Sequence, residues 1–321
     1  MRFGAPVWPF KWEEPYDGAI RRIRGLGFKA VELIGWKAET LDSYYTSQTI
    51  KELRSVLDGE GILLSQFVAN PGELASGDAA VRAQAVETFK RFSDAGAELG
   101  TKIINTVTHF PFAIKNPPLV DRAMVQQYTV DVPGDLDWNQ NWLDYVAAIR
   151  QCAQYAESVG LKYSLEMHPF RYASTTEGLL RLIEAVDNPA LGANFDPSHT
   201  FPNGDFTHVS IYKLADRLWH CDFSDNDGTN NMHFRPGKGK IDWASAMKAL
   251  KDINYDGVVS LEFEDIPGVS RGVRPQAGAY EPRVEASPEV DREYKLALEY
   301  LTGLAHEGTG LSPDTGSGEI R

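Results

Sequence analysis

The chain has 321 residues, of which 42% are hydrophobic, and a formal net charge of −13 with no cluster of lysines or arginines. Nucleic acids and anionic membranes are therefore disfavoured as partners, because binding to them requires a basic face. There is no apolar run of membrane-spanning length and no signal-peptide pattern. With only two cysteines, Cys152 and Cys221, we expect a cytoplasmic protein without disulfides.

Short apolar, β-branched runs alternate with amphipathic segments of helical period along most of the chain. This alternation is typical of a parallel sheet covered by helices, and eight strand–helix pairs in this length favour closure into a barrel. The predicted strands cover residues 2–7, 29–34, 61–68, 101–107, 161–167, 190–195, 217–223 and 257–263. The predicted helices cover residues 14–25, 46–58, 78–99, 138–159, 174–187, 207–215, 242–252 and 286–305.

Two predicted connections are much longer than the usual few residues. Residues 108–137, with four prolines, follow the fourth strand, and residues 264–285, with three arginines, follow the eighth. Both would leave the C-terminal face of the barrel, where insertions form lids and binding walls. We therefore predict an α/β protein with a single (β/α)8 TIM barrel over residues 1–306, with long loops after strands 4 and 8. Residues 307–321 are expected to form a disordered tail.

Each of the last four predicted strands ends in one carboxylate or histidine: Glu166, Asp196, His220 and Glu262. The C-terminal ends of barrel strands converge on one mouth, so these side chains are predicted to meet. Three carboxylates and one imidazole suit Mn²⁺ or Mg²⁺ better than a metal that prefers thiolates. Any one of these residues alone could instead be a solvated residue just past its strand, but the repeat on four strands favours a metal site.

Other histidines stand near the same mouth. His199 follows Asp196 by three residues, so a short turn would bring it to the same pocket as a substrate ligand, or it begins a helix. His109 ends the fourth strand and His168 follows Glu166 by two residues. Each of these two is a candidate base, a candidate donor to a metal ligand or substrate, or a structural histidine.

Further candidates are less specific. Asp222 and His220 are two residues apart on one strand and point to the same side, so one would bind the metal while the other orients it or contacts substrate. His233 and Arg235 precede a Pro-Gly turn that would reach over the mouth, although a flexible turn is the alternative. Trp8 and Trp36 follow early strands and would either stack on a sugar or pack in the core or a lid.

Five segments, residues 165–168, 194–199, 220–225, 235–243 and 255–265, resemble the xylose-isomerase-like barrel superfamily. They are most similar to its sugar phosphate isomerase/epimerase group, which includes ketose 3-epimerases and inosose dehydratases. The resemblance implies that a divalent metal, Mn²⁺ or sometimes Mg²⁺ or Co²⁺, is the cofactor. It also implies that Glu166 and Glu262 are catalytic and exchange a substrate proton, and that His199 and Arg235 contact sugar hydroxyls. The implied metal ligands are Glu166, Asp196, His220 and Glu262.

The implied activity is that of a metal-dependent sugar isomerase or epimerase. One glutamate removes a proton beside a carbonyl, the metal stabilises the enediolate, and the other glutamate returns the proton. The alternative is a lyase, because the same enolate expels a leaving group on the adjacent carbon. Candidate lyases are an inosose-type dehydratase and the large α subunit of a C-glycoside deglycosylase. A deglycosylase of this kind cleaves 3-keto-glycosides and pairs with a small second subunit. In that case His109 would be an extra base.

The expected partner is a small-molecule sugar or glycoside, and we expect a homo-oligomer. A barrel that binds sugar without catalysis is a further alternative, because a fold does not fix a function. The superfamily's DNA-repair endonucleases are a poor match. They need additional histidine ligands, but the third strand offers none, and Asn231-Met-His233 replaces their Asp-x-His pair. The net charge of −13 also disfavours DNA.

Overall fold

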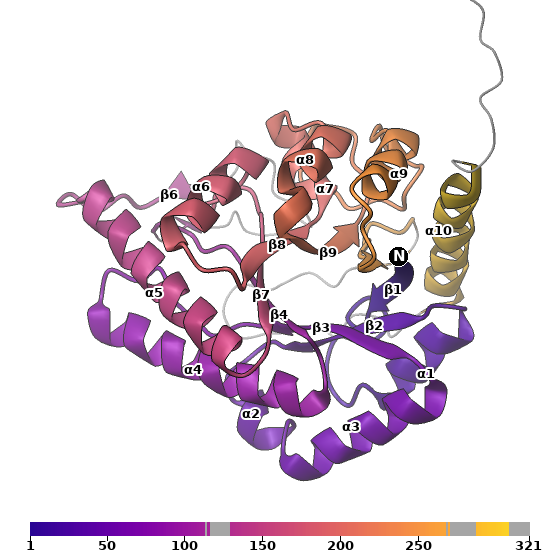
Figure 1. Ribbon diagram of the computed structural model, residues 1–321, viewed down its shortest axis with the longest axis horizontal. Helices are drawn as coiled ribbons and strands as arrows, with labels where there is room; N and C mark the ends of the chain where they lie inside the picture. The colour runs from indigo at the N-terminus through magenta and orange to yellow at the C-terminus, as the bar shows by residue number, and fades with distance from the viewer. Residues whose placement is uncertain (113, 116–128, 268, 270–286, 308–321) are drawn as a thin grey trace, which may run out of the picture.

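A computed structural model describes residues 1–112, 114–115, 129–267, 269 and 287–307. In this part of the chain, eight parallel strands close into a barrel, which confirms the predicted fold (Figure 1). The barrel strands are β1 (Arg2–Pro6), β2 (Ala30–Gly35), β3 (Leu63–Ala69), β4 (Ile103–Val107), β7 (Lys162–Glu166), β8 (Leu191–Phe195), β9 (Leu218–Phe223) and β10 (Val258–Leu261). Neighbours follow this chain order around the barrel, and β10 pairs with β1 to close it.

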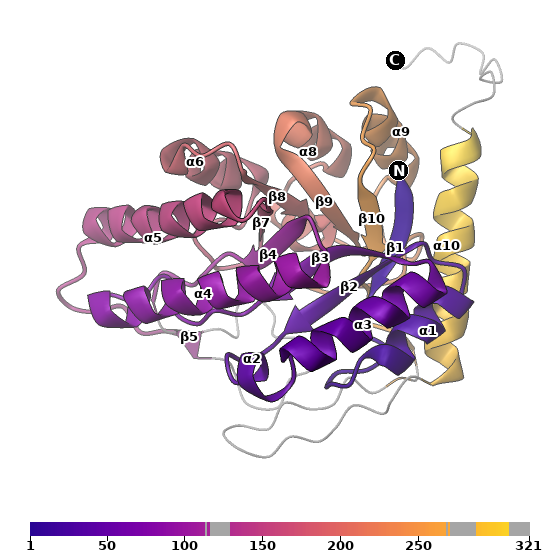
Figure 2. The same ribbon diagram turned by 60° about the horizontal axis from the view of Figure 1, so that its bottom comes forward.

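Helices follow the barrel strands and form a ring around them (Figures 1 and 2). The helix that follows each strand faces it with an apolar stripe. In α6, for example, the stripe consists of the buried Leu179, Leu182, Ile183 and Val186. The main helices are α1 (Asp17–Gly25), α3 (Ser47–Glu60), α4 (Ala79–Leu99), α5 (Trp138–Ser158), α6 (Thr176–Val186), α8 (Thr207–Leu214), α9 (Trp243–Asp252) and α10 (Pro288–Glu307).

Local sequence sets the ends of these helices. The side chains of Thr46, Asp78 and Asp137 accept backbone N–H groups at the starts of α3, α4 and α5. Gly61 and Gly100 end α3 and α4 in the left-handed conformation, which glycine adopts without strain. These signals explain why the predicted ranges agree with the observed elements to within a few residues.

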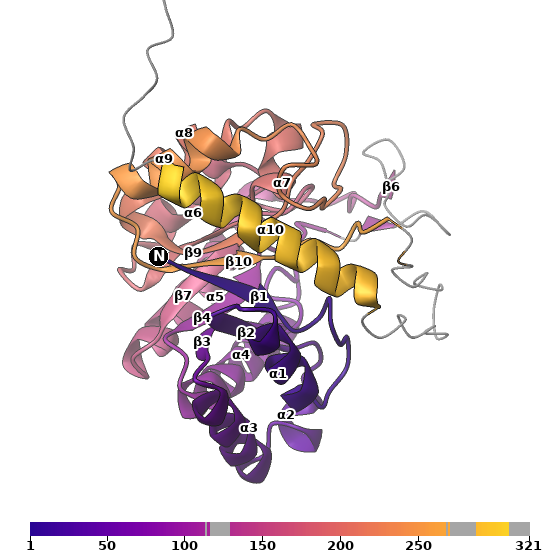
Figure 3. The same cartoon turned by 90° about the vertical axis from the view of Figure 1, so that its right-hand side faces the viewer.

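Several short elements were not predicted. They are α2 (Thr40–Ser43), the antiparallel pair β5 (Ile114–Lys115) and β6 (Thr129–Val130), α7 (Pro197–Thr200), and the 3₁₀ turns η2 (Phe201–Asn203) and η3 (Ala215–Arg217). The pair β5–β6 lies apart from the barrel strands, and α10 runs across the barrel beside β10 (Figure 3). The start of α7 is relevant to function, because its N-cap is Asp196.

Polar side chains fill the barrel interior just below the mouth at the C-terminal ends of the strands. Gln66 on β3 donates to Glu32 on the neighbouring β2 and to Asp222 on β9, on the opposite side of the barrel. The Ser164 hydroxyl on β7 donates to the side-chain oxygen Oε1 of Gln66 at 3.4 Å. All of these side chains are buried. This polar layer supports the floor of the site at the mouth.

The predicted long connections are only partly described. Residues 108–137 join β4 to α5 and include β5 and β6, but residues 116–128 lie outside the described part. The three arginines of the last connection and the expected disordered tail also lie almost wholly outside the described residues. Cys152 and Cys221 are buried free thiols. No described helix is long and apolar enough to cross a bilayer.

Candidate metal centre and active site

Three carboxylates form the central group of the site. Glu166 ends β7, Asp222 lies near the end of β9, and Glu262 directly follows β10. They offer ligand atoms that all lie within 4.8 Å of one another. The atoms Glu166 Oε1, Asp222 Oδ1 and Glu262 Oε2 are buried and have no hydrogen-bond partner. Carboxylate oxygens without donors are costly to bury, so the donor set fits a divalent cation that prefers oxygen.

Asp196 lies beside the central group and is held by hydroxyls. Its side chain accepts from the backbone N–H and hydroxyl of Ser198 and from the hydroxyl of Ser224. His233 Nδ1 is 3.3 Å from Asp196 Oδ2. These contacts follow from local structure, because Asp196 caps α7 while Ser224 follows β9.

Three histidines form a wall on this side. His199 Nε2 lies 3.5 Å from Glu166 Oε1 and 3.8 Å from Asp196 Oδ2, and its Nδ1 contacts Asn231 Oδ1 at 2.7 Å. The His199 ring lies between the rings of His168 and His233, at centroid distances of 3.6 and 4.5 Å. The structure therefore brings the predicted His168, His199 and His233 together beside the carboxylates.

His220 belongs to a different group from the one predicted. It lies with Glu32 and Asp222, with ligand atoms within 4.8 Å, and its Nδ1 contacts Asn194 Oδ1 at 3.1 Å. Among the described residues, the predicted quartet does not form one tight group, and Asp222 takes the central place. Glu32 was not predicted, although a charged residue inside the apolar run of residues 30–34 was a signal.

His109 occupies a structural position. Its Nε2 contacts the carbonyl oxygen of Gly72 at 3.1 Å, and its Nδ1 lies 3.4 Å from the Tyr145 hydroxyl. Burial, together with the positive charge of Arg171, lowers the pKa of His109 to about 3. It is neutral at physiological pH. Among the described residues, His109 is not part of any group of histidine and acidic side chains that could hold a metal ion.

The remaining predicted residues have other contacts. Trp8 Nε1 donates to Glu262 Oε1 at 3.0 Å, so this indole fixes the glutamate. Trp36 lies edge-on to Trp8 and stacks on Trp12 at 4.2 Å, which makes an aromatic wall behind Glu262. The predicted sugar contact Arg235 instead pairs with Glu293 on α10 at 2.8 Å.

The carboxylates repel one another electrostatically. Burial raises the pKa of Glu166 well above its usual value, and the charges of Asp222 and Asp196 raise it further, while Arg171 opposes them. Burial also raises the pKa of Glu262, and the charge of Glu166 adds to the effect. For Asp196, burial raises the pKa to about 6. Without a cation, Glu166, Glu262 and Asp196 are therefore protonated more easily than free carboxyl groups, whereas the burial of Asp222 is outweighed by the charge and close contact of His220, which lower the pKa of Asp222.

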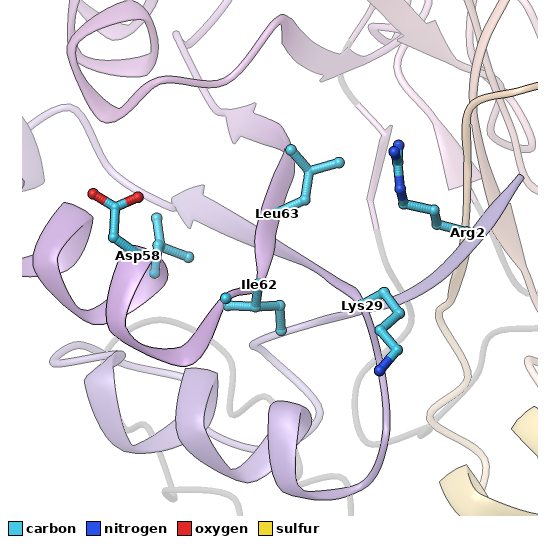
Figure 4. A pocket seen from close by; sticks show the side chains of 7 residues that line it. Arg2, Lys29, Asp58, Ile62 and Leu63 are labelled. Atoms are coloured by element: carbon cyan, nitrogen blue, oxygen red, sulfur yellow. The ribbon is translucent and has the colours of Figure 1, made fainter.

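A hollow at the other end of the barrel is remote from this site (Figure 4). It is open and is lined by residues that begin strands or precede them, including Arg2, Lys29 and Leu63. It therefore lies at the N-terminal face, where side chains of a TIM barrel serve stability.

Comparison with known proteins assigns the family. A sequence model of the xylose isomerase-like TIM barrel family matches residues 20–287. The chain belongs to this family. D-psicose 3-epimerase of Ruminiclostridium cellulolyticum is 25% identical over 260 residues, which cover 79% of this chain and 80% of that protein. Inosose dehydratase of Geobacillus kaustophilus is 24% identical over 308 residues, which cover 90% of this chain and 87% of that protein.

The fold also recurs in solved structures. D-psicose 3-epimerase with D-tagatose from Clostridium cellulolyticum H10 matches with a TM-score of 0.72 and 22% identity. The match covers 95% of this chain and 99% of that one. The predicted superfamily resemblance is thus confirmed, and at this identity the structural likeness concerns the fold.

Proposed function

We propose that this chain is a divalent-metal-dependent sugar isomerase or epimerase that exchanges a proton on the carbon beside a carbonyl. The observation that carries this proposal is the group formed by Glu166, Asp222 and Glu262. Their ligand atoms lie within 4.8 Å of one another at the barrel mouth, and each keeps one buried oxygen without a hydrogen bond. Similarity to D-psicose 3-epimerase supports a ketose-like sugar as substrate. A TIM barrel also places its chemistry at this face.

The residues have distinct proposed roles. Glu166, Asp222 and Glu262 would hold the ion, with Asp196 beside them, and the oxygen-rich set suits Mn²⁺ or Mg²⁺. When bound, the ion supplies Lewis-acid stabilisation of the negative charge that develops on the sugar oxygens. His220 is not assigned to this ion, because the described structure groups it with Glu32 instead.

Glu166 and Glu262 would also transfer the proton. Two barrel strands separate β7 from β10, so these carboxylates approach a substrate in the mouth from different sides. One removes the proton and the other returns it to the opposite face of the carbon, which inverts the centre. Burial raises the pKa of both glutamates, which makes each a stronger base toward the proton that it accepts.

The side walls would select the substrate. The imidazoles of His168, His199 and His233 are placed to hydrogen-bond sugar hydroxyls. Trp36, which is partly buried, would offer apolar ring surface to a sugar face, whereas Trp8 is buried in the core beside it. We assign Arg235 to fixing the loop after β9 on α10 through Glu293, rather than to direct contact with sugar.

The test is proton NMR in D₂O on metal-stripped protein reloaded with Mn²⁺, with the ion removed before acquisition. The panel contains free ketoses, inososes and 3-keto O- and C-glycosides. We expect Mn²⁺-dependent uptake of deuterium beside a carbonyl and a new stereoisomer. Glu166→Gln and Glu262→Gln should each abolish exchange, and full activity in both variants would contradict the assignment.

A lyase that uses the same proton abstraction is the second candidate. Two observations favour it: similarity to an inosose dehydratase over 90% of the chain, and the long connection of residues 108–137 between β4 and α5. The same NMR panel separates the candidates, because a lyase releases water or aglycone instead of a stereoisomer. Sugar binding without exchange on any substrate, even in saturating Mn²⁺, would favour a binding barrel.

A further inference from the structure

A second set of metal-type ligands lies below the central group, and the proposed reaction uses only one of its three members, Asp222. Glu32 on β2 and His220 and Asp222 on β9 offer ligand atoms that all lie within 4.8 Å of one another. His220 precedes Asp222 by two residues on the same strand, so it lies deeper in the barrel. The exposed fractions of Glu32, His220 and Asp222 are 0%, 0% and 1%.

In each of the two carboxylates of this lower set, only one of the two oxygens accepts a hydrogen bond, and the Gln66 amide donates to both of these oxygens. The Gln66 amide donates to Glu32 Oε2 at 2.6 Å and to Asp222 Oδ2 at 3.1 Å. The Asn194 amide also donates to Asp222 Oδ2. The other two oxygens, Glu32 Oε1 and Asp222 Oδ1, are buried and have no hydrogen-bond partner. Each of these two adjacent buried carboxylates therefore keeps one oxygen that receives none of the amide hydrogen bonds, and Asp222 Oδ1 has only the His220 ring near it, at 3.4 Å.

His220 has a nitrogen lone pair available. The Asn194 side-chain nitrogen Nδ2 donates to Asp222, so the side-chain oxygen Oδ1 of Asn194 faces His220 Nδ1 at 3.1 Å and accepts its proton. The same Nδ1 lies 3.4 Å from Asp222 Oδ1. In this tautomer Nε2 carries a lone pair, and this atom is buried without a hydrogen-bond partner.

The charges in the barrel exceed what one cation offsets. Glu32, Asp196 and Glu166 all interact electrostatically with Glu262, and Asp222 interacts with Glu32, Glu166 and Glu262. These are five carboxylates in one interior. When all five are ionised, one divalent cation at the mouth compensates two of their charges. The others then need protons or a second cation, because buried charges without compensation are strongly unfavourable.

We propose that Glu32, His220 and Asp222 form a second divalent-cation site in the barrel interior. Asp222 would connect it to the cation at Glu166 and Glu262. Two carboxylates and one imidazole suit Mn²⁺ and related first-row metals. This inference rests on the proposed function only because the two sites share Asp222. The role of the second cation would be to fix the Asp222 carboxylate and to offset the negative charge of the interior.

The first experiment measures metal stoichiometry. The protein is stripped with chelator, saturated with MnCl₂, freed of unbound metal on a desalting column and assayed by elemental analysis. We expect two Mn²⁺ per chain in the wild type. EPR of the same sample should show magnetic coupling between the two ions, instead of the hyperfine pattern of isolated Mn²⁺.

Variants then separate the two sites. Glu32→Gln keeps the side chain's shape but removes the anionic ligand, so Mn²⁺ should fall from two to one per chain, and the coupling should disappear. His220→Gln should do the same, and it serves as the second variant if the first fails to fold. Glu262→Gln is the matched control at the upper site, which should lose the upper ion while Glu32 retains the lower one.

One Mn²⁺ per chain in the wild type, unchanged in Glu32→Gln, would overturn the second site. In that case the interior charge is offset by a proton on Glu32. The proposed function is judged separately by deuterium uptake. One ion with deuterium uptake would overturn only the second site, whereas two coupled ions without uptake would overturn only the isomerase assignment.

Discussion

The Glu262 carboxylate accepts a hydrogen bond at one oxygen and none at the other. Trp8 Nε1 donates to Oε1 at 3.0 Å, while Oε2 has no hydrogen-bond partner. A donor to the charged form stabilises it, so we expect the Trp8 hydrogen bond to favour ionised Glu262, whereas burial raises the pKa of this glutamate. Trp8 is therefore a positioning residue for the proposed proton transfer.

We predict that Trp8→Phe reduces kcat about tenfold, the equivalent of roughly 1.4 kcal/mol for one hydrogen bond to a charged group. The pKa of Glu262 rises when the donor is lost, so the acid limb of the pH–rate profile should move to higher pH. Trp36→Phe is the matched control, because the Trp36 indole donates to the Trp12 carbonyl oxygen. Equal effects of both variants would point to a general loss of aromatic packing.

Substitution of His109 distinguishes a structural role of this residue from a catalytic one. Because both ring nitrogens contact Gly72 and Tyr145, we predict that His109→Asn destabilises the fold by about 1–3 kcal/mol, the cost of buried groups left without partners. Deuterium exchange by the folded variant should stay within about threefold of wild type. Urea unfolding and NMR exchange measure the two effects. Loss of exchange with unchanged stability would restore His109 as a base.

The candidate site was only partly predictable at the scale of residues. Strand-end position selects Glu166 and Glu262 as candidates, because barrel geometry brings strand ends together. It could not separate His220 from Asp222, since residues two apart share one side of a strand and only depth distinguishes them. Glu32 was missed because it lies within its strand, and its contact through Gln66 crosses the barrel.

At the scale of elements, β8 and β9 meet at a position that only glycine fits. A Cβ on Gly192 would lie 2.2 Å from Trp219 Nε1 and 2.4 Å from the Arg217 carbonyl oxygen. We predict that Gly192→Ala destabilises the barrel by about 3 kcal/mol, at the upper end for overpacking, because backbone must move. Urea unfolding measures the change.

Gly18 in α1 gives the matched comparison. A Cβ there would meet nothing within 4 Å, so Gly18→Ala should stabilise the protein by up to about 1 kcal/mol through helix propensity. If Gly192→Ala were equally harmless, the close approach between β8 and β9 would not be a feature of the folded protein.

The long elements were predictable and the short ones were not. Apolar periodicity and capping residues determine α3, α4 and α5 largely by local interactions. In contrast, α7 has only four residues and starts where Asp196 accepts the Ser198 N–H. A sequence pattern of that length carries no periodicity, so its helical turn, which brings His199 back toward Glu166, depends on tertiary context.

At the scale of the whole molecule, the interior carboxylates link stability to pH. The folded-state pKa of Asp196 is raised from 3.8 to about 6, chiefly by burial. The folded protein therefore binds more protons than the unfolded chain between these values, and stability falls as pH rises through this window. The loss for Asp196 alone is about 3 kcal/mol, from about 1.4 kcal/mol per pKa unit. Raised pKa values of Glu32, Glu166 and Glu262 extend the decline to higher pH.

Divalent cations should reverse this decline, because they bind the deprotonated carboxylates and not the unfolded chain. We predict that the melting temperature of metal-free protein is higher at pH 5 than at pH 8, and that the increase produced by Mn²⁺ is larger at pH 8. Differential scanning calorimetry of stripped and reloaded protein measures both. Glu262→Gln removes one titrating ligand, so it should flatten the metal-free pH dependence and shrink the Mn²⁺ effect. If metal-free protein instead became more stable from pH 5 to pH 8, these carboxylates would already be ionised and their charges compensated. That result would remove the electrostatic reason for a cation at the mouth.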